Sequence, residues 1–190
     1  MDIAPLNRKF VDLYRDRIIL ISGNGQNVGK TTMGCRLIRH FKDLNHKVYA
    51  LKVSPHIHSS KSPYTLISNS RFTLSLERNK DTDKDSSRYL NAGADASFFL
   101  QVRNEHIREA AEYTFSLIPQ DALAVVESGA FRFHFKPQVF LFLQRKNDKI
   151  NRKKNNELAL LADRIVNFDG SQFNFDIEQI AVKDSKIYLC

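Results

Sequence analysis

Apolar runs alternate along this chain with segments whose apolar residues recur every three or four positions. The runs are short and mostly β-branched or aromatic, which is typical of strands buried on both faces in a parallel sheet. We expect strands at 18–21, 47–53, 97–102, 122–126, 139–143 and 164–168. We expect helices at 7–15, 30–44, 86–92, 105–117 and 157–162. This alternation predicts an α/β fold with a mostly parallel sheet, flanked by helices and joined by right-handed crossovers.

The stretch 54–84 departs from that alternation, because Ser, Asn, Lys and Asp are frequent in it. Within it, apolar and polar residues alternate over 72–76, a pattern that predicts a strand of a hairpin. Long loops in compact domains are commonly lids or small insertions. We therefore expect one domain over 1–190, with a lid or hairpin insertion around 54–84.

Composition narrows the class of protein. Hydrophobic residues make up 42% of the 190 residues, enough for a substantial core, and the net charge of +8 favours phosphate-bearing partners without choosing among them. No run alternates basic and aromatic residues as an RNA-binding sheet does, so we do not expect nucleic acid as the partner. Cys35 and Cys190 form neither a disulfide framework nor a metal cluster. We find no signal peptide and no apolar stretch near the roughly 20 residues that span a bilayer, and expect a cytoplasmic protein without a membrane partner.

The strongest motif lies between the first strand and the first long helix. It comprises Gly23, Asn24, Gly25, Gln26, Asn27, Val28, Gly29, Lys30, Thr31 and Thr32. Glycines let backbone N–H groups approach an anion, and the dipole of the following helix favours negative charge. In such a loop Lys30 reaches the β and γ phosphates, and the Thr31 hydroxyl binds the Mg²⁺ that bridges them. These features predict a three-layer P-loop NTPase fold that binds GTP or ATP with Mg²⁺.

The loop departs from the common spacing of that motif. The usual pattern has four residues between its first glycine and the Gly-Lys pair, which assigns the first glycine to the position of Asn24. Either Asn24 replaces that glycine, or the loop is longer by one residue and begins at Gly23. Asn tolerates unusual backbone angles better than most residues.

Two charged residues lie at the carboxyl ends of predicted strands, where open α/β sheets bind ligands. Glu127 ends the strand at 122–126, and it is our candidate to contact Mg²⁺ through water or to polarise an attacking water. The alternative is a carboxylate that caps a loop. Lys52 interrupts an apolar strand, where burial without an anion would be costly. It either faces the triphosphate or a second substrate, or extends to solvent.

Other polar residues are weaker candidates. Asp83 and Asp85 are candidates for metal or substrate binding, although Asp85 is equally suited to cap the helix at 86–92. His56 and His58 have a spacing that binds metal on a strand, but we see no third ligand and expect a solvated loop. The basic run over 145–154 is more typical of a solvated face than of a site.

The order of these motifs resembles the protein B family of molybdopterin-guanine dinucleotide biosynthesis. The resemblance is carried by Gly29-Lys30-Thr31-Thr32, by Ala50-Leu51-Lys52 before His56 and His58, by the stretch 84–94 (KDSSRYLNAGA), and by Val125-Val126-Glu127. It implies a GTP-binding adaptor with weak NTPase activity, often dimeric, which assists a molybdenum-cofactor biosynthesis enzyme. It also implies that Lys30, Thr31 and Thr32 hold phosphates and Mg²⁺, with Asp85 and Glu127 near the metal.

The chain also departs from that family. Ser128 stands where the family usually has a glycine after the acidic residue, and the stretch 59–83 is longer than expected. The loop from Gly23 to Thr31, with Lys52 ending the second strand, is also similar to dethiobiotin synthetase. That resemblance implies an ATP-dependent ligase or kinase, in which Lys30 and Lys52 serve carboxyl and phosphoryl transfer to a small molecule.

Overall fold

The computed structural model describes residues 15–55, 64–146, 153–184 and 186–190. The helix expected at 7–15 lies outside these residues except for Arg15, which begins a 3-10 turn, η1 (Arg15–Arg17). His56 and His58 also lie outside them, as do residues 147–152 of the basic run over 145–154.

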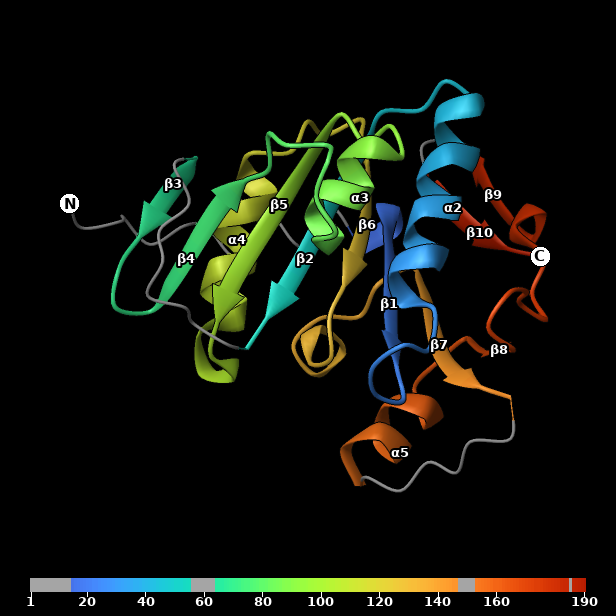
Figure 1. Ribbon diagram of the computed structural model, residues 1–190. Helices are drawn as coiled ribbons and strands as arrows, with labels where there is room; N and C mark the ends of the chain where they lie inside the picture. The colour runs from blue at the N-terminus through green and yellow to red at the C-terminus, as the bar shows by residue number, and fades with distance from the viewer. Residues whose placement is uncertain (1–14, 56–63, 147–152, 185) are drawn as a thin grey trace.

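A single large sheet forms the middle of the molecule (Figure 1). Its strands are β1 (Ile18–Gly23), β2 (Val48–Ser54), β3 (Thr65–Ser68), β4 (Phe72–Leu76), β5 (Ala96–Val102), β6 (Leu123–Glu127), β7 (Val139–Arg145) and β8 (Arg164–Phe168). Their order across the sheet is β3-β4-β5-β2-β6-β1-β7-β8. The six strands from β5 to β8 in this order run parallel, whereas β3 and β4 are antiparallel to their neighbours.

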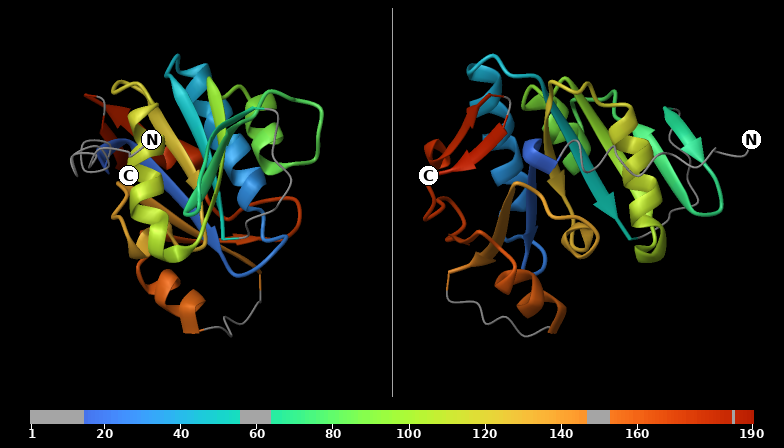
Figure 2. Two further views of the ribbon diagram at one scale, coloured as in Figure 1. Left: turned by 90° about the vertical axis from the view of Figure 1, so that its left-hand side faces the viewer. Right: turned by 180° about the vertical axis from the view of Figure 1, so that it is seen from behind.

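Helices cover both faces of the sheet (Figure 2). One face packs against α2 (Lys30–Asp43), α3 (Asp85–Asn91) and a separate hairpin of β9 (Ile180–Lys183) and β10 (Lys186–Leu189). The other face packs against α4 (Ile107–Ser116), η3 (Phe131–Phe133) and α5 (Lys153–Leu160). The expected mostly parallel α/β sheet flanked by helices is therefore confirmed.

The apolar pattern that predicted β1 explains its place at the centre of the sheet. Ile18 and Leu20 face one core, Ile19 and Ile21 face the other, and all four are fully buried. Successive side chains of a strand point to opposite faces, so a strand buried on both faces must be apolar throughout. Because β1 and β2 both pair in parallel with β6, the carboxyl ends of these three strands lie side by side at one edge of the sheet.

The hairpin strand expected at 72–76 is confirmed as β4, which pairs with β3 and extends the sheet beyond β5. Two other elements differ from the sequence-based expectation. The last helix, α5, begins at Lys153 rather than at 157, and the β9–β10 hairpin was not predicted. Its two short strands pair only with each other, a local arrangement that leaves little periodic signal in the sequence.

The expected capping role of Asp85 is wrong. Lys84 occupies the N-cap position of α3, which has no side-chain cap, and Asp85 is the first helical residue. Its carboxylate instead contacts Thr31 and Lys52 from other elements. This arrangement is favoured because an ion pair with the partly buried ammonium of Lys52 is stronger than a hydrogen bond to a backbone amide at the start of the helix. Gly93, however, ends this helix with a φ of 105°, the left-handed conformation that was expected there.

Close packing of α2 against α3 depends on a residue without a side chain. Tyr89 of α3 is fully buried, and its ring lies directly over Gly34 of α2. A Cβ at position 34 would lie 2.6 Å from Cε1 of that ring. The glycine therefore sets how closely the two helices approach, and with it the position of Tyr89.

We predict that Gly34→Ala destabilises the fold. Alanine gains up to about 1 kcal/mol over glycine in a helix interior, but overpacking a rigid core costs roughly 1–3 kcal/mol. The net loss is about 1 kcal/mol, a fall in Tm of about 2–4 °C for a domain of this size. Thermal unfolding measures it, with Gly129→Ala as the control because a Cβ there meets nothing within 4 Å. A variant as stable as the control would contradict this role of Gly34.

Candidate functional site

A polar pocket of about 630 Å³ opens at the carboxyl edge of the parallel strands. Its lining comes from the loop before α2 and the start of that helix, and from the carboxyl ends of β2, β6, β7 and β8. Its walls are formed by Gln26, Asn27, Gly29, Lys30, Thr31, Thr32, Lys52, Asp85, Arg88, Glu127, Arg145, Phe168 and Gly170. In open α/β sheets this crevice is where ligands bind.

The loop from β1 to α2 turns sharply by means of left-handed backbone conformations. Gly25, Asn27 and Gly29 have positive φ values of 99°, 56° and 85°. Asn24 does not: its N–H continues the strand pairing by donating to the carbonyl of Leu143 at 2.8 Å. The left-handed part of the loop therefore begins at Gly25, whereas Asn24, the first residue after β1, does not take a glycine's conformation.

In the described part of the chain, no side chain caps the start of α2. The N-cap residue is Gly29, and no acidic residue lies in the first turn. The amides at the start of a helix have no intrahelical acceptors, and they carry the positive end of the helix dipole. Such an end favours an anion, because backbone donors and dipole act together on it.

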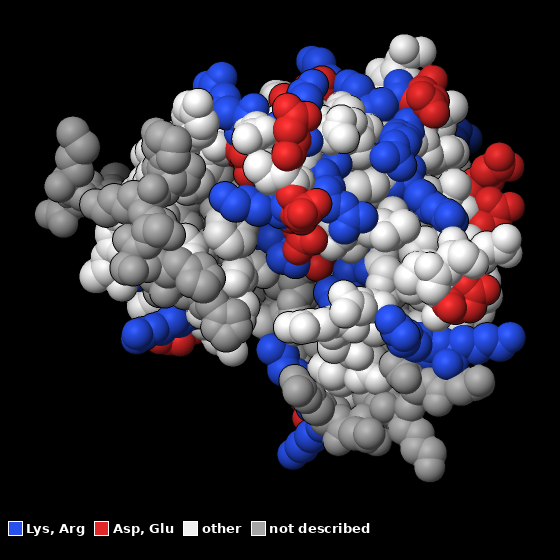
Figure 3. Space-filling model, in the orientation of Figure 1, with Lys and Arg blue, Asp and Glu red and all other residues white. Residues whose placement is uncertain are grey.

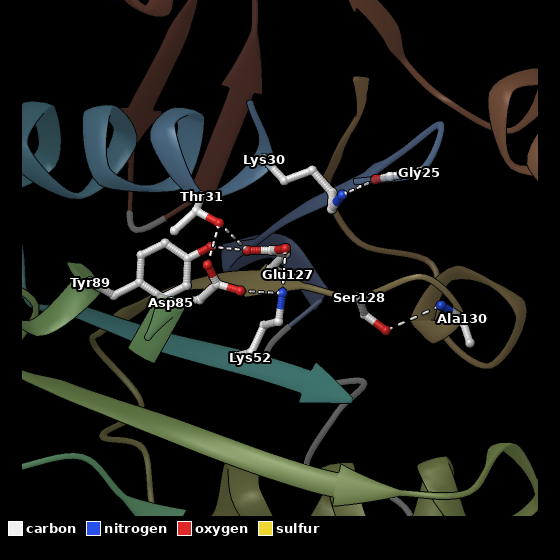
Figure 4. Close-up of polar contacts among 9 residues, drawn as sticks. All are labelled: Gly25, Lys30, Thr31, Lys52, Asp85, Tyr89, Glu127, Ser128 and Ala130. Atoms are coloured by element: carbon white, nitrogen blue, oxygen red, sulfur yellow. Dashed lines mark hydrogen bonds and ion pairs between the residues drawn. The ribbon is translucent and has the colours of Figure 1, made fainter. Parts of the chain in front are cut away.

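Lys30 extends across the mouth of this loop, where its ammonium donates to the carbonyl of Gly25 (Figure 4). Burial is the largest influence on the pKa of Lys30 and lowers it. The charge of Lys52 lowers it further, whereas Glu127 and Asp85 act in the opposite direction. A bound anion would restore the balance by stabilising the ammonium form.

Lys52 and Glu127 are brought together by the strand register. They are direct neighbours across the parallel pair β2–β6, so their side chains point to the same face. The ammonium of Lys52 lies 2.5 Å from Oε1 of Glu127 and 2.7 Å from Oδ2 of Asp85. Glu127 is 2% exposed, so its charge requires these partners.

Thr31 connects the helix to the same carboxylates. Its hydroxyl lies 2.6 Å from Oδ1 of Asp85 and 3.3 Å from Oε2 of Glu127 (Figure 4). A hydroxyl has one proton to donate, and the shorter contact assigns it to Asp85. The lone pairs of Thr31 then remain available to a cation.

Tyr89 of α3 provides a further hydrogen bond to Glu127. Its hydroxyl donates to Oε2 of Glu127, and its ring is fully buried against α2. Burial and the neighbouring charge of Glu127 raise the pKa of Tyr89 well above its usual value, so it stays a proton donor. Both oxygens of Glu127 therefore accept from fixed groups.

The contacts of Lys52 and Asp85 decide the charge states of these two side chains. Burial alone would lower the pKa of Lys52, but the charge of Glu127 and hydrogen bonds to Asp85 and Glu127 outweigh it and raise that pKa. Burial would raise the pKa of Asp85, but hydrogen bonds from Lys52 and Thr31 lower it. Lys52 is thus an ammonium and Asp85 a carboxylate at neutral pH.

The residues predicted from sequence are largely gathered here. Gln26, Asn27, Gly29, Lys30, Thr31, Thr32, Lys52, Asp85 and Glu127 line the pocket. Four other residues belong to the loop but do not line the pocket: Gly23, Asn24, Gly25 and Val28. Val28 is buried, with 1% of its surface exposed. Asp83 is exposed and does not line the pocket. Ser128 faces away: its hydroxyl accepts from the amides of Ala130 and Phe131.

Sequence reasoning missed Tyr89, Arg88, Arg145, Phe168 and Gly170. A signal existed for Tyr89, since it follows Asp85 by four residues and so shares its face of α3. Arg145 and Phe168 end β7 and β8, and the rule that ligands bind at the carboxyl ends of strands would have included them.

The donor set at this pocket fits a hard divalent cation. Thr31, Asp85 and Glu127 offer only oxygen ligands, which Mg²⁺ prefers. No group of three or more His, Cys, Asp or Glu side chains suited to chelate a metal occurs in the described part of the chain. The set therefore suits a cation that keeps several waters and takes further oxygens from a bound phosphate.

A scan against models of known protein families found no match, and searches of curated proteins and of solved structures found none either. Among the described residues, no helix has the length and apolar character needed to cross a membrane.

We predict that Lys52→Met destabilises the protein by about 3 kcal/mol, because it leaves buried Glu127 without its cation. Urea unfolding measures the free energy. Lys47→Met is the matched control, since its ion pair with Asp121 is solvent-exposed and we expect almost no change there. Equal stability of the two variants would show that the pairing of Lys52 with Glu127 contributes nothing.

Proposed function

We propose that this chain is a P-loop nucleotide-binding protein that holds Mg²⁺ and a nucleoside triphosphate in the pocket at the start of α2. The observation that carries the proposal is an uncapped helix start, with Lys30 across its loop and Thr31 beside two carboxylates. A phosphate chain is the ligand that matches this combination of amides, ammonium and cation-binding oxygens.

Each residue then has a role in binding or in charge neutralisation. The loop amides and Lys30 bind the phosphates. Thr31 offers its lone pairs to Mg²⁺ while its hydroxyl donates a hydrogen bond to Asp85. Glu127 orients a water toward the terminal phosphate once its contact with Thr31 opens. Bound Mg²⁺ supplies neutralisation of phosphate charge, and the chain contributes positioning.

We infer a GTP-binding adaptor with slow hydrolysis in molybdopterin guanine dinucleotide biosynthesis, active as a dimer beside a biosynthetic enzyme. This finer assignment rests on the family resemblance carried by the phosphate loop, by the stretch 84–94 and by Glu127. Both oxygens of Glu127 are engaged by Lys52 and Tyr89, so a water-activating carboxylate is tightly restrained. Slow turnover is the expected consequence.

A second candidate is an ATP-dependent ligase or kinase acting on a small molecule, as in dethiobiotin synthetase. The observation favouring it is Lys52, a charged ammonium on the pocket wall next to the proposed terminal phosphate. Such a group stabilises charge on a transferring phosphoryl or carboxyl group. Turnover that rises strongly when one metabolite is added would favour this candidate over the adaptor.

We predict that Lys30→Ala weakens binding of Mg²⁺-GTP and Mg²⁺-ATP by about two orders of magnitude, since a desolvated charge-assisted contact contributes about 3 kcal/mol. Calorimetric titration measures the affinity, and circular dichroism checks the fold. Lys136→Ala is the control, because Lys136 is exposed and precedes β7 at the opposite edge of the sheet. Unchanged affinity of a folded Lys30→Ala variant would remove the proposal.

We also predict that Glu127→Gln slows hydrolysis by about 10²-fold while weakening triphosphate binding far less, since an amide cannot polarise water as a carboxylate does. Steady-state phosphate release and titration measure the two effects. Glu178→Gln, an exposed position on η4 (Ile177–Gln179), is the matched control. Wild-type turnover in a folded Glu127→Gln protein would exclude Glu127 from the reaction.

A further inference from the structure

A second hollow lies on the outer surface between α2 and α3, next to the phosphate pocket. It has a volume of about 340 Å³ and is lined by Thr32, Cys35, Arg36, Arg39, Arg88 and Asn91. We call it the arginine groove. Figure 3 shows basic side chains gathered over the face that these two helices cover.

Helical spacing explains why these side chains converge. Positions 32, 35, 36 and 39 form one stripe of α2, and positions 88 and 91 form one stripe of α3. The two stripes face each other across the groove. Arg36, Arg39 and Arg88 therefore line one small hollow and all three are exposed to solvent, although like charges repel one another.

The described part of the chain provides no ion-pair partner for these arginines. None of Arg36, Arg39 and Arg88 forms a salt bridge with a carboxylate there. Arg88 helps to lower the pKa of Asp85, but both oxygens of that carboxylate already bind Lys52 and Thr31. The groove therefore has a net positive charge that its own side chains do not neutralise.

The groove has fixed walls. Gly34 and Tyr89 hold the two helices in close contact, and the thiol of Cys35 donates to the carbonyl of Arg88 at 3.5 Å. The guanidinium of Arg36 lies 4.9 Å from the ring centre of Phe173 and contacts the carbonyl of Ser171 at 3.5 Å. These contacts fix the backbone of both walls and hold the side chain of Arg36, so less entropy is lost there when a ligand binds.

We propose that the arginine groove is a second anion site, which binds the phosphate group of a small phosphorylated molecule. Guanidinium groups match phosphate oxygens in pairs, and three of them can surround one phosphate group. Thr32 and Arg88 line both the groove and the phosphate pocket, so the two ligands bind side by side. The site depends on its own contacts and does not require a nucleotide in the neighbouring pocket.

The test follows the side-chain Nε–Hε signals of Arg36, Arg39 and Arg88 by NMR during titration with inorganic phosphate and with glycerol 3-phosphate. Sodium chloride at equal ionic strength controls for screening. The titrations are repeated in Lys30→Ala, which weakens capture by the neighbouring loop. Arg39→Gln removes one wall of the groove, and Arg103→Gln removes the same charge from an exposed position after β5.

We expect saturable shifts of the three arginine signals with both compounds, preserved in Lys30→Ala and in Arg103→Gln. In Arg39→Gln the affinity falls at least about tenfold, because a charge-assisted hydrogen bond is lost. A linear response equal to that of chloride would overturn the proposal, as would saturable binding that disappears in Lys30→Ala but survives in Arg39→Gln. Binding of inorganic phosphate without binding of the ester would contradict the assignment to a phosphorylated molecule.

Discussion

The buried carboxylate of Glu127 requires compensation, and the groups that provide it organise the whole site. Glu127 is the last residue of β6, a strand buried between two cores, so its carboxylate must be paired or hydrogen-bonded. Lys52 arrives from the neighbouring strand by register, and Tyr89 arrives from α3 because Gly34 leaves room for its ring. Asp85 pairs with the same Lys52 ammonium, and the Thr31 hydroxyl donates to Asp85. One electrostatic requirement thus links two strands and two helices at the carboxyl edge of the sheet.

The start of α2 has the opposite requirement: its amides and Lys30 are positive, and no acidic side chain of the described residues caps the helix or pairs with Lys30. Placed beside each other, the negative and positive clusters suit a ligand that carries phosphates and a hard cation together. Lys52 separates the two carboxylates, which would otherwise repel each other. This arrangement explains how a protein can hold one buried and one partly buried acid in place before any cation arrives.

Much of this could be predicted from the sequence, because local patterns carry it. The apolar runs of β1 and β6 and the glycines of the loop identified the sheet and the turn at its edge. The role of Asp85 could not be settled from the sequence, because metal or substrate binding and helix capping both suit an acid at a helix start. Only its tertiary contacts with Lys52 and Thr31 exclude capping. Tyr89 appears in sequence as an ordinary core aromatic, and its partner lies 38 residues away. The β9–β10 hairpin is held by the pairing of its own strands and by contacts of β10 with η1 and β7, which no periodicity reveals.

The central claim is that phosphates bind to the backbone of the turn between β1 and α2. A crystal structure of the protein with Mg²⁺ and a non-hydrolysable nucleoside triphosphate tests it most directly. The account predicts β and γ phosphates surrounded by the amides from Gly25 to Thr32, with the Lys30 ammonium moved from the Gly25 carbonyl onto them. A triphosphate bound elsewhere, with the Lys30 contact to Gly25 unchanged, would contradict it.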